Sequence, residues 1–223
     1  MPVNIDAYNT ILKEFSTKNV TLVAVSKTKP NEDIETLYSF GQIDFGENYV
    51  QELVNKQAAL PKDIRWHFIG HLQSNKVKYI APFVHLIHGV DSLKLLQEIN
   101  KQGIKNNRII NCLLQIHIAQ EETKFGFDET ELAAVKDINE SLTNIRIDGF
   151  MGMASFTEDQ VKVGEEFAYL KQLFEQFKLN MLINSSFTTL SMGMSGDYQL
   201  AIKCGSNMVR IGSLLFGARN YAQ

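Results

Sequence analysis

The sequence has few of the residues that mark special classes of protein. Its two cysteines, Cys112 and Cys204, show no metal-type spacing and sit in apolar surroundings, which predicts reduced thiols in a cytosolic protein. Only four prolines and no low-complexity tract argue against linkers and disorder. No apolar run is long enough to cross a bilayer, and residues 1–18 lack the pattern of a signal peptide. We therefore expect a cytoplasmic protein without a membrane segment.

The charge is nearly balanced, at -3 for 223 residues. A nucleic-acid-binding protein would need a concentrated basic patch, so nucleic acid is not an expected partner. A chain of this length can bury a full core. Because no composition shift marks a boundary, we expect a single domain over residues 1–223.

Apolar runs of strand length alternate with amphipathic stretches along the chain. The predicted strands are 21–26, 43–45, 65–69, 84–90, 108–118, 145–151, 188–192 and 208–211. Nearly all are separated by helical segments, as parallel strands require. Eight such units predict a (β/α)8 TIM barrel, and an open doubly wound sheet is weakened because no G-x-G-x-x-G follows the first strand. Apolar residues at helical spacing from Ile5 to Phe15 predict an extra N-terminal helix that caps the barrel.

Lys27 follows the first predicted strand. Val23, Val25 and Lys27 share one face, so Lys27 is expected at the barrel mouth if the valines fill the interior. A lysine there can form a Schiff base with an aldehyde when its surroundings favour the neutral amine. The alternative is that Lys27 and Lys29 are ordinary solvated loop lysines. Lys29 precedes Pro30 and is expected nearer the surface.

The last two strands end in segments that suit a phosphate. Gly212 allows close approach to the backbone, and Ser213 can donate to an anion from the start of a helix. Ser191 ends the seventh strand and is followed by Gly193 and Gly196, and phosphate sites after strands seven and eight recur in this fold. Gly-Ser turns are also common helix caps, so each segment alone is weak. A lysine and a phosphate turn on the first and last strands of a closed barrel would be neighbours, which suits pyridoxal 5'-phosphate (PLP).

Arg210 lies two residues before Gly212, within reach of a ring held by that phosphate. An arginine facing the pyridine nitrogen keeps the nitrogen unprotonated, because two positive charges repel. Such a ring is a poor electron sink, which disfavours transamination and decarboxylation and leaves racemisation or simple carriage. The alternative is a salt-bridged barrel arginine.

Several other polar groups are candidates for the site, the rim or the core. Asn48 can hydrogen-bond the cofactor or cap the next helix. His71 is expected near the mouth, and His67 is expected to be a satisfied core or interface histidine. His85 and His88 differ by three positions and are expected on opposite faces of a strand. Lys124 is a candidate for the rim. We see no metal site and no Ser-His-Asp arrangement in this pattern.

With these residues in hand, the chain resembles the YggS/PROSC family of pyridoxal phosphate homeostasis proteins. The matching segments span almost the whole chain in order: residues 24–30, 45–52, 66–76, 123–126, 190–195 and 209–213. The resemblance implies a barrel like the N-terminal domain of alanine racemase, with PLP as an internal aldimine on Lys27. It also implies that Arg210 lies near the pyridine nitrogen and that Ser191, Gly212 and Ser213 contact the phosphate.

The resemblance implies control of intracellular PLP levels without an established catalytic reaction. Alanine racemases add a second domain and take an opposite-face tyrosine base from a partner subunit. No room for that domain and no second base are found in this sequence. A PLP carrier is therefore the leading hypothesis, and a small PLP-dependent racemase and a Schiff-base aldolase acting through Lys27 are the alternatives. The expected partners are the cofactor and PLP-dependent apoenzymes, and the expected state is a monomer.

Overall fold

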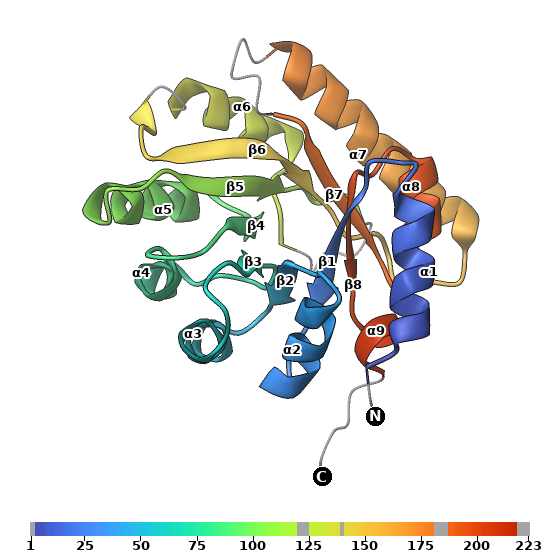
Figure 1. Ribbon diagram of the computed structural model, residues 1–223. Helices are drawn as coiled ribbons and strands as arrows, with labels where there is room; N and C mark the ends of the chain where they lie inside the picture. Colours follow the sequence, from blue (N-terminus) through green and yellow to red (C-terminus); the bar gives the residue numbers. More distant parts are fainter. Residues whose placement is uncertain (1–2, 120–124, 139–140, 181–186, 218–223) are drawn as a thin grey trace.

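Eight parallel strands close into a barrel in the computed structural model, which describes residues 3–119, 125–138, 141–180 and 187–217. Each strand pairs with the next in sequence, and the last pairs with the first (Figure 1). The predicted (β/α)8 barrel is therefore confirmed. The strands are β1 Thr21–Val25, β2 Asp44–Glu47, β3 Arg65–Phe68, β4 Leu86–Val90, β5 Ile110–Gln115, β6 Ile145–Met151, β7 Thr189–Met194 and β8 Met208–Ile211.

Helices surround the strands on the outside of the barrel (Figure 1). Their apolar sides pack on the strands, as in α5, where Leu95, Leu96 and Ile99 are buried. Among the described residues the helices are α1 Ile5–Phe15, α2 Asn31–Ser39, α3 Val50–Ala59, α4 Val77–Ile80, α5 Leu93–Lys105, α6 Glu129–Ile138, α7 Gln160–Asn180, α8 Tyr198–Lys203 and α9 Ser213–Phe216, with the 3-10 turn η1 Ser74–Lys76.

The extra N-terminal helix α1 is present, but the expectation that it caps the barrel end is wrong. The Asn4 backbone N–H at its start donates to the Leu215 carbonyl of α9 at 2.8 Å. At its other end, the Phe15 ring meets the Tyr198 ring of α8 edge-on, with centroids 6.0 Å apart. The helix thus runs along the side of the barrel beside the short helices α8 and α9 (Figure 1). It covers the part of the barrel side that α8 and α9 leave uncovered, and this contact buries the apolar side of α1.

The interior of the barrel is only partly apolar. Five apolar side chains form a small cluster inside it: Val23, Leu86, Leu113, Met151 and Met208. Buried polar side chains share that space: Asp44, His67, His88, Ser191 and Arg210. Branched apolar residues usually fill such barrels, so a polar interior needs full hydrogen bonding to be tolerated.

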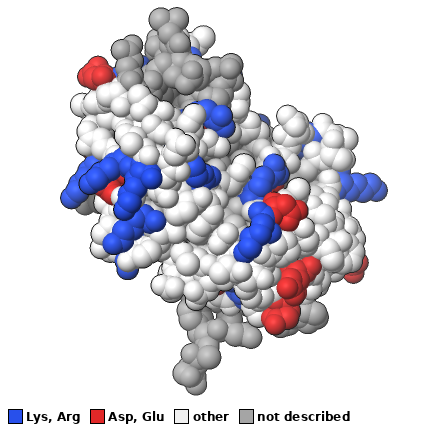
Figure 2. Space-filling model, turned by 60° about the vertical axis from the view of Figure 1, so that its left-hand side comes forward, with Lys and Arg blue, Asp and Glu red and all other residues white. Residues whose placement is uncertain are grey.

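The surface carries charges of both signs. On the face drawn in Figure 2, groups of basic and acidic side chains are separated by wide uncharged areas. The described residues form no continuous basic stripe on that face. No helix in the described parts of the chain is long and apolar enough to span a membrane.

Candidate cofactor-binding site

A cavity of about 530 Å³ opens where the carboxyl ends of the strands meet. Five of the six predicted site residues line it: Lys27, Asn48, Arg210, Gly212 and Ser213. They come from segments far apart in sequence, which the closed barrel brings together because β1 pairs with β8. The volume is in the range that small-molecule sites occupy, roughly 300–1,000 Å³.

Lys27 reaches this cavity in the predicted way. Val23 belongs to the apolar cluster inside the barrel, and Val25 and Lys27 line the cavity above it. Strand alternation therefore places the lysine at the mouth. Its half-buried side chain differs from that of a solvated loop lysine.

The turn that carries Lys27 is strained and firmly anchored. Thr28 has a φ of 63°, which is unfavourable for a β-branched residue. Its backbone N–H donates to Glu52 Oε1 at 2.6 Å. Strain of this kind persists only where surrounding contacts enforce it, and it gathers at functional sites.

A buried group of charges beneath the turn supplies this anchoring. Lys56, only 5% exposed, contacts the carboxylates of Glu47 at 2.8 Å and Glu52 at 2.7 Å. It also donates to the Ser26 carbonyl at 2.8 Å, and the Ser26 hydroxyl donates to Glu47 at 2.6 Å. Burial raises the pKa of Glu47, although Lys56 and Ser26 oppose that rise. These contacts tie the end of β1 to β2 and α3. No pattern in the sequence revealed this group.

Lys29 is not the surface lysine that Pro30 suggested. It is half-buried, lines the cavity and donates from Nζ to the Phe216 carbonyl at 2.7 Å. The reason is the turn itself, in which the Lys29 backbone N–H donates to the Ser26 carbonyl and folds the chain toward α9. A second positive charge therefore lies on the wall that holds Lys27.

Arg210 is buried on β8 and is held by neutral acceptors. Its Nη1 donates to the Ser191 carbonyl at 2.8 Å and hydroxyl at 2.7 Å, and its Nη2 donates to the Gly152 carbonyl at 3.1 Å. Burial lowers the pKa of Arg210 to about 10, which leaves it charged at neutral pH. No carboxylate of the described residues forms an ion pair with it, so the salt-bridged alternative is not observed. Arg210 lines the cavity, so its positive charge lies beside whatever occupies it.

Ser191 is the one predicted site residue that does not line the cavity. It is fully buried behind Arg210, and its Oγ lies 3.1 Å from His88 Nδ1. Its contact with a phosphate stays a prediction. Ser195 and Gly196 line the cavity instead, and Ser195 Oγ accepts from the Gly212 backbone N–H at 3.2 Å.

The place of Ser195 follows from an irregularity in β7. Gly193 has a φ of 95°, and the pairing of β7 with β8 shifts register between Ser191 and Met194. The strand therefore continues to Met194, two residues beyond its predicted end, and brings Ser195 to the mouth. The glycines in this segment were the signal that an irregularity was present.

Gly212 is needed where β8 leaves the barrel. A Cβ atom there would lie 3.2 Å from both the Cβ and the carbonyl oxygen of Val25. The absence of a side chain thus lets the β8 end approach β1, and Ser213 follows as the exposed first residue of α9. The described geometry puts two hydroxyls, of Ser195 and Ser213, on the same cavity wall.

Asn48 lines the cavity and does not act as a helix cap. The N-cap of α3 is Tyr49, so the capping alternative is excluded. The buried Oδ1 of Asn48 has no hydrogen-bond partner among the described residues. A Cβ on Gly70 would lie 2.5 Å from the Asn48 carbonyl oxygen, so this glycine allows the segment after β3 to approach Asn48 closely. Because buried polar atoms are nearly always paired, the orphaned amide fits a ligand contact.

The segment after β6 forms a wall that the sequence analysis missed. Met153, Ser155, Phe156 and Gln160 line the cavity. The buried Glu166 carboxylate holds this segment by accepting from both the Ser155 backbone N–H and its hydroxyl at 2.6 Å. Apolar and hydroxyl residues of this kind carry no distinctive sequence pattern.

His71 lies on the rim and outside the cavity lining. Its Nδ1 is 2.9 Å from an Asp91 carboxylate oxygen, and its ring stacks on Phe125 with centroids 4.3 Å apart. The candidate Lys124 falls outside the described residues.

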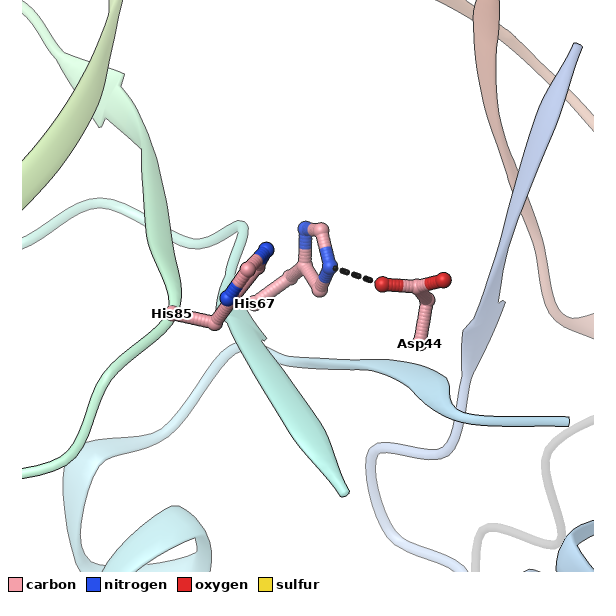
Figure 3. A group of neighbouring side chains, drawn as sticks. All are labelled: Asp44, His67 and His85. Atoms are coloured by element: carbon pink, nitrogen blue, oxygen red, sulfur yellow. Dashed lines mark hydrogen bonds and ion pairs between the residues drawn. The ribbon is translucent and has the colours of Figure 1, made fainter. Parts of the chain in front are cut away.

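His67, His85 and Asp44 meet at the amino-terminal end of the barrel (Figure 3). His67 is a satisfied core histidine, as predicted. The expectation that His85 and His88 lie on opposite faces of a strand is wrong, because both rings lie near the His67 ring, with centroids 5.3 and 5.2 Å from it. His85 precedes β4, so strand alternation does not apply to it. Burial is the main reason that the pKa of His85 falls to about 4.

We call Asp44, His67 and His85 the Asp44 cluster. One ligand atom from each lies within 4.8 Å of the others, a grouping that could hold a metal ion and that sequence spacing did not reveal. Both oxygens of Asp44 already have partners, one in His67 and one in Arg65. The Arg65 charge beside the carboxylate opposes a cation, so the cluster is better described as a hydrogen-bonded group.

Comparisons with known proteins extend the resemblance. The family model of the alanine racemase N-terminal domain matches residues 4–220. The pyridoxal phosphate homeostasis protein of Haemophilus influenzae is 42% identical over 206 residues, 91% of this chain and 86% of that protein. PipY of Synechococcus elongatus, solved with PLP bound, is 32% identical with a TM-score of 0.84, over 92% of this chain and 98% of that chain. Alanine racemase of Streptomyces coelicolor shares the fold, with a TM-score of 0.76 at 12% identity over 98% of this chain and 60% of that chain.

Proposed function

The chain belongs to the family of pyridoxal phosphate homeostasis proteins, and from this premise we propose that it binds PLP in the cavity, covalently through Lys27. We propose further that it buffers the cofactor without a dedicated reaction. The observation that carries the proposal is the single cavity lined by an amine, a buried guanidinium and two hydroxyls, of Lys27, Arg210, Ser195 and Ser213. PLP supplies an aldehyde that forms a Schiff base with an amine and a ring that withdraws electrons from the attached carbon.

Each part of the cofactor has a suitable group in the wall. Lys29 and Arg210 favour the neutral amine at Lys27, because a further positive charge beside them is unfavourable. The hydroxyls of Ser195 and Ser213 can donate to a phosphate, and Gly212 places no side chain in its way. The orphaned Asn48 amide offers a hydrogen bond to a polar ring substituent.

The charge on Arg210 argues for carriage over catalysis. A pyridine nitrogen facing that guanidinium stays unprotonated, which weakens the ring as an electron sink. The titratable side chains that line the described cavity are Lys27, Lys29, Asp197 and Arg210. Asp197 accepts from the Met194 backbone N–H, and none of the four is a convincing second base opposite Lys27.

Borohydride trapping tests the attachment. The protein is incubated with PLP, reduced, digested and mapped by mass spectrometry. The expected result is a pyridoxyl group on Lys27, whereas modification of Lys29 alone would contradict the assignment. The same treatment without PLP but with a sugar phosphate tests the aldolase alternative, which requires a trapped substrate.

Proton exchange tests the racemase alternative. Loss of the α-proton from a panel of amino acids in deuterated water is compared with free PLP at the same concentration. The carrier proposal expects no exchange above that of the free cofactor. Faster exchange that Lys27→Ala removes would establish catalysis.

The remaining proposals concern the chain as a whole. We propose a single PLP-binding domain over residues 1–223, a monomeric state and PLP-dependent apoenzymes as recipients. We also propose a cytoplasmic location, which suits the free cysteines Cys112 and Cys204. Size-exclusion chromatography with light scattering tests the monomer, and transfer of label to an apoenzyme tests the recipients.

A further inference from the structure

Five buried polar side chains form one continuous path through the barrel interior, which we call the interior relay. Arg210 Nη1 lies 2.7 Å from Ser191 Oγ, which lies 3.1 Å from His88 Nδ1. His88 Nε2 lies 2.9 Å from His67 Nδ1. His67 Nε2 lies 2.9 Å from Asp44 Oδ1, the contact drawn as a dashed line in Figure 3. The relay thus joins β8, β7, β4, β3 and β2. It runs from the cofactor cavity to the opposite end of the barrel.

The burial of these groups makes their pairing necessary. None of the five is more than 6% exposed. A buried polar atom left without a partner costs more than a hydrogen bond contributes. A barrel interior of branched apolar residues would avoid this risk, as the neighbouring apolar cluster does. Packing alone therefore gives no reason for a polar path across the interior.

Asp44 fixes the direction in which the relay donates. Burial would raise the pKa of Asp44, but His67 and Arg65 outweigh this and lower it, so the carboxylate is ionised and can only accept. His67 must then donate from Nε2. If neutral, it accepts at Nδ1 from His88 Nε2.

The rest of the relay follows from that first step. His88 accepts at Nδ1 from the Ser191 hydroxyl, which leaves the Ser191 oxygen free to accept from Arg210. Every donor then meets one acceptor. Burial is the main cause that lowers the pKa of His88, and the Arg210 charge lowers it further, which agrees with a neutral ring at this point.

We propose that Asp44 orients this relay and that the relay holds the Arg210 guanidinium in place at the cavity. Asp44 is then a positioning residue for the PLP ring, although it lies at the far end of the barrel. This role rests on the proposed function. Its chemical basis is the fixed tautomer of each histidine, which can be measured without PLP.

Nitrogen chemical shifts of the histidines in the PLP-free protein give the direct test. In the wild type, we expect both His67 and His88 to carry their proton on Nε2. In Asp44→Asn, Arg65 as a charged donor takes the amide oxygen, and the amide N–H turns to His67 Nε2. Both histidines should then change to the Nδ1-protonated form.

Two further variants serve as controls. Asp148→Asn is the matched carboxylate-to-amide change, since Asp148 pairs with Arg146 at 2.7 Å on β6 and has no place in the relay. It should leave both tautomers unchanged. Ser191→Ala cuts the relay near Arg210, and both histidines should keep Nε2 protonated because Asp44 still directs them.

The dissociation constant for PLP supplies the functional readout. We expect Asp44→Asn to weaken binding by about fivefold or more, the lower range of coupling between distant sites, and Asp148→Asn to change it by less than about twofold. Ser191→Ala should also weaken binding, and it serves as the test if Asp44→Asn does not fold.

Three results would overturn the proposal. Wild-type histidines protonated on Nδ1, or doubly protonated, would contradict the direction of the relay. Histidine tautomers that stay unchanged in Asp44→Asn would contradict the claim that Asp44 orients the relay. Reversed tautomers with unchanged PLP affinity would remove the positioning role. Failure of the wild type to bind PLP would overturn both the proposed function and the positioning role of Asp44. The histidine tautomers would still show whether Asp44 orients the relay.

Discussion

Replacement of Lys56 by methionine should destabilise the protein far more than replacement of an exposed lysine. Methionine fills much of the same volume, so the loss is chiefly electrostatic. Lys56 contacts Glu47, Glu52 and the Ser26 carbonyl, and Glu47 is completely buried. Removing one partner of a buried pair costs about 3–5 kcal/mol because the other charge is left uncompensated. That is a large part of the total stability of a typical domain, about 5–15 kcal/mol.

Urea unfolding followed by the fluorescence of the single, buried Trp66 measures this loss. Lys18→Met is the matched control, because Lys18 forms a half-exposed pair with Glu14 at 3.1 Å and should cost only about 0.3–0.5 kcal/mol. The double variant Glu47→Gln with Lys56→Met should recover part of the loss, since the fully buried charge of Glu47 is then removed along with that of Lys56. Equal effects of Lys56→Met and Lys18→Met would refute the reasoning.

The Lys56 effect should also depend on pH. The folded pKa of Glu47 lies above its ordinary value of 4.5, mainly through burial. The contribution of such a group to stability is full below 4.5 and is lost as the pH rises through the folded pKa. Without Lys56 that pKa rises further. The deficit of Lys56→Met should therefore be smallest under acid conditions and grow toward neutral pH, and a deficit that shrinks with rising pH would contradict this.

Three further predictions concern other parts of the molecule. Gly70→Ala should lower the free energy of unfolding by about 1–3 kcal/mol and weaken PLP binding, since its Cβ would lie 2.5 Å from the Asn48 carbonyl oxygen. Urea unfolding and PLP titration measure these two effects, and unchanged values would refute the close contact. Burial raises the pKa of the Cys112 thiol, so Ellman's reagent should modify it no faster than the protein unfolds. Zinc should not raise the melting temperature through the Asp44 cluster, because Arg65 opposes the cation, and a zinc-dependent rise lost in Asp44→Asn would contradict this.

The barrel could be predicted because each strand and helix carries its own local pattern. Apolar runs of strand length, separated by helical periodicity, admit few topologies once parallel pairing is required. The end of each element was harder to place. β5 was expected over 108–118 and spans Ile110–Gln115, because apolar residues that continue beyond a strand carry no stop signal.

The site could be predicted where strand alternation applies and not where it breaks. Lys27 and Arg210 were placed correctly because both follow regular inward-facing positions. Ser195 was not among the predicted site residues, because the register shift between Ser191 and Met194 that accompanies its place at the cavity cannot be located from composition alone. The neighbours of Lys56 and the partners of Asp44 come from different strands and helices, so only the folded chain reveals them.

The visible absorption spectrum of the protein with PLP shows whether Lys27 anchors the cofactor. The wild type, Lys27→Ala and the matched variant Lys29→Ala are each incubated with PLP and desalted. We expect a retained Schiff-base band in the wild type and in Lys29→Ala, and none in Lys27→Ala. A band that survives in Lys27→Ala, or no band in the wild type, would contradict this expectation.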